Sequence, residues 1–270
     1  MQRKVSMSSP RLHHERANPA TGIIASLLAV ISIAACSAAS AREHEPTAGS
    51  PTADEVIAHY YRAIGGHDRL EQVVTRHMWG TYSEGTLDAK TDIVWKRPSL
   101  RRVNVHAPGF DYSEGFDGRT WEYNFQKHQL VVDTGAAADA GRRGAEFDES
   151  FVDYARKGQT VQMVGAESFE SRPAHRMRVT LADGWQKEYV FDDSTGLILA
   201  LRKAMPIHAT GPAVTSITAY EDWRREGGVL QPHRFTEHDA RAGRLLNTLQ
   251  WDSIRTNVDL SASELGRPAH

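Results

Sequence analysis

Residues 172–181, RPAHRMRVTL, alternate apolar and polar side chains with a period of two. From His175 to Leu181, every second side chain lies on one face of an extended strand, and the arginines and threonine between them lie on the other. One covered face and one solvated face are typical of strands in an antiparallel sheet. The stretch therefore predicts a mainly β fold.

The same alternation recurs along most of the chain. Turn sequences such as Asp183-Gly184 and Gly227-Gly228 separate the alternating stretches, as they do in hairpins. We expect about ten or eleven strands in one large antiparallel sheet, which curls because strand twist accumulates. A sheet curled around helices that do not fill it completely leaves an apolar hollow, and a filled core is the alternative.

Two helices are expected beside the sheet, which makes the fold α+β. Thr52 and Glu55 form a capping box at the start of a helix that Gly65-Gly66 ends near residue 64. A second amphipathic stretch, with Phe147 and Phe151 on its apolar side, predicts a helix at 145–157. We expect both helices to cover the concave face of the sheet.

The N-terminus has the pattern of a bacterial lipoprotein signal peptide. A basic segment precedes 13 uncharged residues at 23–35, too short to span a bilayer as a helix, and Ile33-Ala34-Ala35-Cys36 resembles a lipobox. We predict a signal peptide at 1–35, a lipidated Cys36 with a flexible tether at 36–51, and one domain at 52–270. An ordinary signal peptide with an incidental cysteine is the alternative, and either Met1 or Met7 is the start.

Composition and motifs argue against several functions. The chain has 32 basic and 34 acidic residues and no basic run, so we expect no nucleic-acid binding. The histidines lack metal-ligand spacing, and His233 and His238, five apart in a predicted strand, point to opposite faces. No G-x-S-x-G motif is present. We therefore expect no metal, no cofactor and no enzymatic activity.

Four segments carry a family resemblance. Residues 58–75, the 115–121 hairpin, the stretch 189–197 and the stretch 220–232 resemble the outer-membrane lipoprotein-sorting (LolA/LolB-like) superfamily. The resemblance extends from about 52 to 268. It implies a half-open antiparallel β-barrel, with helices as a lid, whose apolar hollow takes acyl chains without performing chemistry.

The preferred function is that of a lipoprotein on the periplasmic face of the outer membrane that binds a lipid or the acyl chains of lipidated proteins, for carriage or insertion. The alternative is an envelope-stress sensor or adaptor that acts through a periplasmic protein partner. An enzyme with a site assembled from scattered residues is a third possibility. The ligand, the partner and the oligomeric state stay open. The predicted ligand-binding wall consists of Trp79, Trp95, Val103, Val105, Met177, Val179, Leu199 and Trp251.

Overall fold

The computed structural model describes residues 49–206 and 211–268. The predicted signal peptide, Cys36 and nearly all of the tether lie outside the described residues. Residues 44–270 form one compact unit, and every hydrophobic cluster lies inside it. We therefore expect this unit to fold without residues 1–43. Within the described residues, no helix is both long and apolar enough to cross a membrane.

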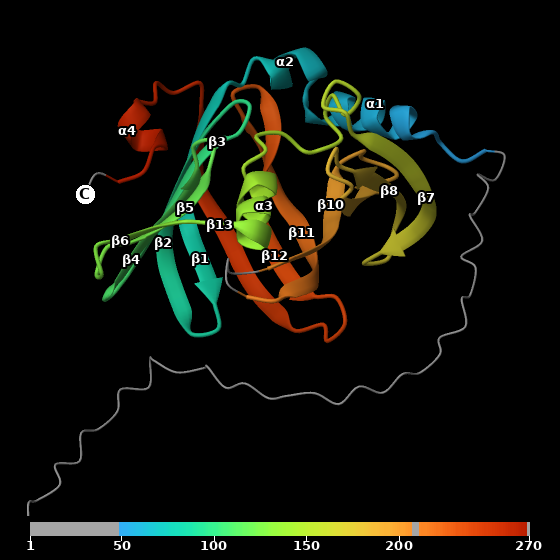
Figure 1. The fold of residues 1–270 in the computed structure, drawn as a ribbon. Helices are drawn as coiled ribbons and strands as arrows, with labels where there is room; N and C mark the ends of the chain where they lie inside the picture. Colours follow the sequence, from blue (N-terminus) through green and yellow to red (C-terminus); the bar gives the residue numbers. More distant parts are fainter. Residues whose placement is uncertain (1–48, 207–210, 269–270) are drawn as a thin grey trace, which may run out of the picture. The chain divides into compact units, whose positions relative to one another are not determined.

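One antiparallel sheet of thirteen strands dominates the structure (Figure 1). Its order, β6-β5-β4-β3-β2-β1-β13-β12-β11-β10-β9-β8-β7, joins the first and last strands at the centre and leaves β6 and β7 at the edges. The predicted curled antiparallel sheet is confirmed, with more strands than expected. The strands are β1 (Thr75–Glu84), β2 (Leu87–Lys96), β3 (Leu100–Ala107), β4 (Phe110–Phe116), β5 (Thr120–Asn124), β6 (Gln129–Val132), β7 (Thr160–Phe169), β8 (Arg172–Thr180), β9 (Gln186–Asp192), β10 (Ile198–Pro206), β11 (Ala213–Glu226), β12 (Val229–Asp239) and β13 (Leu245–Thr256).

In the part of the chain that the structure describes, four helices accompany the sheet. They are α1 (Ala53–Ile64), α2 (His67–Glu71), α3 (Gly135–Gly144) and α4 (Ala262–Leu265). The first predicted helix is confirmed as α1, with its capping box at Thr52 and a left-handed Gly65 (φ 115°) at its C-terminus. Its inner face is buried in the main hydrophobic cluster. The second predicted helix is not found where it was expected.

The capping box of α1 gives a first prediction. The Thr52 side chain accepts a hydrogen bond from the Glu55 backbone N–H at 3.2 Å, and the Glu55 carboxylate accepts one from the Thr52 N–H at 2.8 Å. We expect Thr52→Ala to lower the free energy of unfolding by about 1 kcal/mol in urea titrations, because the Glu55 backbone N–H loses its side-chain acceptor. Thr160→Ala, at an exposed strand end, is the control and should change stability by less than about 0.5 kcal/mol. Equal effects would contradict the prediction.

The prediction of a helix at 145–157 is wrong. Residues 145–159 form turns and irregular backbone, and the nearby helix, α3, ends at Gly144. Asp153 has a φ of 50°, which a continuous α-helix does not permit. Two backbone N–H groups here bond outward, that of Phe147 to the Pro98 carbonyl and that of Ser150 to the Tyr189 hydroxyl. The apolar pattern marked buried residues correctly but not the conformation that buries them.

The core consists of three clusters. The largest joins α1 and residues 147–152 to the inner face of β8, β9 and β10, and a smaller one lies on the inner face of β1, β2 and β13. A third, around Val190 and Leu199, lies on the opposite face of the sheet. Members of both inner clusters also line the cavity described next.

Candidate functional site

A cavity of about 390 Å³ lies on the concave face of the sheet. Side chains of β1, β2 and β3 line one side and those of β9 to β13 another, and residues of α1 and α2, together with Trp185 and members of the segment 143–152, complete the lining. This volume falls in the range of about 300–1,000 Å³ that is common for small-molecule sites. Apolar side chains form much of the wall. They include Met78, Ile93, Leu201, Phe235, Leu249 and Ile254.

Two of the predicted wall residues line this cavity. Trp251 is almost fully buried, with 2% of its surface exposed, and packs with the cluster around Met78. Trp95 lies on the neighbouring wall and donates a hydrogen bond from Nε1 to the Ala145 carbonyl at 2.8 Å. Val103 packs against the same cluster without lining the cavity. Two aromatic residues from strands far apart in sequence therefore meet at one hollow.

Met177 and Val179 lie deeper, in the packed core. Both side chains are fully buried in the main cluster below α1, and neither lines the cavity. Leu199 lies in the cluster on the opposite face. A β-bulge between Ile198 and Ala200 is the reason, because the extra residue breaks the period of two.

Trp79 and Val105 are also placed away from the cavity lining. Trp79 stacks on His77, with ring centroids 3.7 Å apart, and lies under the Arg255 guanidinium. Met78 takes the inward position on β1, so the assumed register was off by one residue, which moves a side chain to the other face. Val105 is half-buried on β3, next to but outside the lining.

The cavity is covered by α3 and the segment that follows it, residues 145–158. Figure 1 shows α3 across the concave side of the sheet. At one end, Thr120 on β5 bonds the Ala138 carbonyl. At the other, Arg142 and Arg143 contact the Asp183 carboxylate at 2.7 and 3.0 Å. This cover therefore bridges the two arms of the curled sheet.

Side chains from the sheet hold the cover by its backbone carbonyls. Arg101 Nη1 donates to the Gly144 carbonyl at 2.8 Å, next to the Trp95 contact. Arg76 Nη1 donates to the Phe147 carbonyl at 2.9 Å, and its guanidinium lies 4.3 Å from the centre of the Phe147 ring. These polar attachments add to the apolar packing of Phe147, Phe151 and Val152 in the main cluster.

Arg97 joins the cover to the helical end of the domain. Its guanidinium bonds the Val73 and Leu70 carbonyls, both at 2.7 Å, and forms an ion pair with Asp148. Burial lowers the pKa of Arg97 to about 10, so the guanidinium stays charged at neutral pH. One side chain thus ties β2, the end of α2 and the cover together.

We expect Arg97→Met to lower the free energy of unfolding by about 3 kcal/mol, because it leaves the half-buried Asp148 carboxylate and two carbonyls without their donor. Urea denaturation measures the loss. Arg178→Met is the matched control, since Arg178 pairs with Glu188 at a more exposed position of β8, and should cost less than about 1 kcal/mol. A loss at Arg97 no larger than that of the control would contradict its role.

Charged and phenolic groups occupy the covered end of the cavity. The Tyr189 hydroxyl donates to Glu149 at 2.8 Å, and burial together with the Glu149 charge raises the pKa of Tyr189 well above its ordinary value. Burial lowers the pKa of Lys187, although Glu149 and Glu146 oppose this shift. Burial also lowers the pKa of Arg76 to about 10. The cavity is therefore apolar along its wall and polar beneath its cover.

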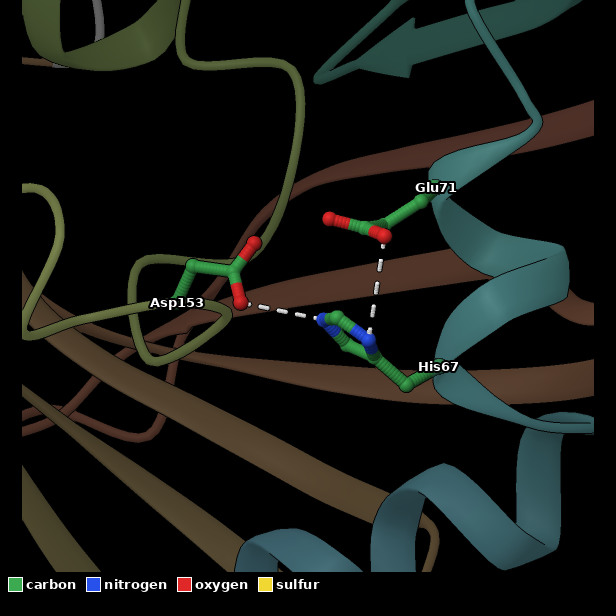
Figure 2. A group of neighbouring side chains, drawn as sticks. All are labelled: His67, Glu71 and Asp153. Atoms are coloured by element: carbon green, nitrogen blue, oxygen red, sulfur yellow. Dashed lines mark hydrogen bonds and ion pairs between the residues drawn. The ribbon is translucent and has the colours of Figure 1, made fainter.

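A separate cluster of His67, Glu71 and Asp153 lies outside the cavity (Figure 2). Asp153 faces Nε2 of the imidazole at 3.0 Å, while Glu71 lies 4.0 Å from Nδ1. A metal ion bound to one nitrogen of the imidazole would need both carboxylates on the side of that nitrogen, whereas here each carboxylate faces a different nitrogen. Arg156 also contacts both carboxylates, at 2.6 Å from Asp153 and 3.8 Å from Glu71. The cluster thus connects α2 to the cover through polar contacts.

The sequence predictions missed the polar half of the site. Arg76, Lys187 and the carbonyls of residues 144–147 were not identified. The signal for Arg76 was its spacing of two from Met78, which places both on one face of β1. No local pattern in the sequence shows that residues 144–147 lie opposite β1.

Comparison with known proteins gives the fold family. No protein-family model and no curated protein matches the chain. Among solved structures, a LolA superfamily protein from Nitrosomonas europaea matches with a TM-score of 0.53 at 14% identity, covering 81% of this chain and 99% of that one. The chain has a LolA-like fold. The resemblance seen in the sequence is confirmed at this level.

Two further structures share the LolA-like fold. A DUF1329 family protein from Desulfovibrio piger matches with a TM-score of 0.56 at 14% identity, over 78% of this chain and 97% of that chain. A domain from Vibrio parahaemolyticus named for outer-membrane lipoprotein sorting matches with a TM-score of 0.51 at 9% identity, over 78% and 94% of the two chains. At these identities the match describes the fold and leaves the ligand open.

Proposed function

We propose that this LolA-like protein binds the acyl chain of a lipid or of a lipidated protein in the cavity beneath α3 and residues 145–158. The observation that carries the proposal is the cavity of about 390 Å³ with Met78, Leu249 and Trp251 in its wall. Burial of an acyl chain there contributes about 0.8 kcal/mol per CH₂ group. The protein would act as a binding protein without enzymatic activity.

The proposed location of the protein in the cell rests on its N-terminal sequence. A lipidated Cys36, with residues 37–51 as tether, would hold the domain at the periplasmic face of the outer membrane. The named sorting function of the Vibrio parahaemolyticus domain supports a role in carriage or insertion of lipidated molecules. The polar attachments of the cover at Gly144, Ala145 and Phe147 are the contacts that would break on ligand entry.

Native mass spectrometry with lipid extraction tests the proposal on residues 44–270 expressed in a periplasm. This unit lacks Cys36, so any lipid found is not the protein's own anchor. We expect an acyl species bound in stoichiometric amount, lost when the protein is denatured. A ligand-free mass that does not change after addition of lipid would overturn the proposal and favour action through a protein partner.

A further inference from the structure

Donor groups in the cavity wall lack hydrogen-bond acceptors. The Arg76 Nε is buried without a partner, even though Nη1 of the same guanidinium is bonded to the cover. Gln231, with 7% of its surface exposed, has an unpartnered, buried Nε2 in the same wall. Buried donors are nearly always paired, and an unpaired one costs about 1–3 kcal/mol. A ligand that brings acceptor atoms would remove this cost.

Two cations of the cavity also lack a carboxylate partner. Among the described residues, no carboxylate oxygen lies within 4.0 Å of the Arg76 guanidinium or the Lys187 ammonium. The Lys187 ammonium lies 5.4 Å from the centre of the Tyr189 ring. Glu149 is near enough to both cations to raise their pKa values, but its carboxylate accepts the Tyr189 hydroxyl. Arg76 and Lys187 thus have Glu149 nearby but no carboxylate in direct contact beneath the cover.

The carboxylates that line the cavity have partners of their own. Three of them pair with a cation, whereas Glu149 accepts the neutral Tyr189 hydroxyl and keeps its negative charge near Arg76 and Lys187. The four pairs are Glu146 with Lys157, Asp148 with Arg97, Glu149 with Tyr189, and Glu237 with Lys203. Apart from one Asp148 oxygen and the Thr218 hydroxyl, the unpartnered groups of the cavity lining are cations and N–H donors.

Arg76 lies on the same strand face as part of the apolar wall. Arg76, Met78 and Tyr82 all line the cavity from the inner face of β1. Successive inward positions on a strand are about 7 Å apart. A group held by Arg76 thus lies one such step from the wall formed by Met78, Ile93 and Trp251.

We propose that the cavity selects a single-chain amphiphile whose anionic head, a carboxylate or a phosphate, accepts hydrogen bonds from Arg76 and Lys187 while its acyl chain lies on the wall around Met78. This inference rests on the proposed function and adds the chemistry of the head group. An arginine provides donors in a fork that matches both carboxylate and phosphate. Neutral heads would leave both cations without an anionic group in direct contact.

Titrations of the 44–270 unit, followed by the fluorescence of Trp95 and Trp251, test the head group. The probes are dodecanoate, dodecyl phosphate, methyl dodecanoate and inorganic phosphate. We expect both anionic amphiphiles to bind at least about tenfold more tightly than the methyl ester, as one hydrogen-bonded charge pair would give. Inorganic phosphate should not bind at concentrations that saturate dodecyl phosphate.

The outcomes separate this inference from the proposed function. Equal affinity for the acid and the methyl ester would overturn the inference and leave acyl binding intact, whereas no binding of any amphiphile would overturn both. Binding of inorganic phosphate as tight as that of dodecyl phosphate would also overturn it, because the acyl chain would then contribute nothing.

Variants locate the head group. Arg76→Met should weaken dodecanoate at least about tenfold and change the methyl ester by less than about twofold. Because Arg76 also holds the Phe147 carbonyl, Lys187→Met provides a second variant with no such bond. Arg178→Met is the matched control on the strand next to β9 and should keep the full preference. Retention of that preference in both cavity variants would overturn the inference.

Discussion

Replacement of Phe151 by alanine is expected to lower the free energy of unfolding by about 4 kcal/mol. The Phe151 ring is fully buried and makes edge-on contacts with Tyr60, Tyr189 and Phe191 at centroid distances of 5.0, 4.9 and 5.2 Å. Each such aromatic pair contributes about 0.5–1.5 kcal/mol beyond the area it buries. Because the ring joins the cover, α1 and β9, its loss leaves a void that no single element can close.

Urea denaturation of Phe151→Ala and of Phe110→Ala measures this contribution. Phe110 is the matched control, because it is 39% exposed and stacks only on Tyr112 at the start of β4. We expect the control to lose less than about 1 kcal/mol. Losses of similar size in the two variants would mean that residues 150–158 are not anchored in the core through this ring.

The general fold could be predicted from local patterns. The period of two in β8 and the capping box of α1 are properties of neighbouring residues, and the structure confirms both. The helix expected at 145–157 failed because its apolar spacing results from burial along a turn, in which Asp153 has a left-handed backbone. Periodicity alone does not separate these two ways to bury a side chain.

The site was harder to predict than the fold. Trp95 and Trp251 line the cavity, although the register of β13 shifts beside Trp251, and Leu199 lies beside a bulge of β10 that no local sequence pattern predicts. Val179 is on the inner face as expected, but core residues cover it, so a charge there would test folding rather than ligand contact. Burial in a core and exposure to a cavity give the same sequence pattern.

The polar end of the site depends on contacts between distant segments. Arg76 reaches a carbonyl 71 positions later in the chain, and the Tyr189 hydroxyl meets Glu149 across 40 positions. An arginine or tyrosine in an alternating strand carries no local sign of such a partner. The sequence patterns therefore did not identify the charged groups beneath the cover, which distinguish this site from a purely apolar cavity.

Leu249→Asp is expected to weaken acyl binding about 100-fold. Leu249 is half-buried on β13 and lines the cavity between Asn247 and Trp251. An aspartate at this position would expose its carboxylate to water in the cavity, so we expect the variant to fold. The variant loses about 1.5–3 kcal/mol of apolar contact, and an acyl chain would also have to strip water from the new charge. Methyl dodecanoate is the probe, because a neutral head excludes simple repulsion between the ligand and the new aspartate.

Leu245→Asp is the matched control for the wall. Leu245 lies on the same strand, four residues earlier, but is 52% exposed and does not line the cavity. Both variants add one negative charge to β13, so a general effect of charge on the domain would weaken them equally. Binding lost only at Leu249, with unchanged urea midpoints in both variants, would locate the acyl chain on this wall. Normal binding by a folded Leu249→Asp variant would move the chain away from β13 and require another route through the concave face.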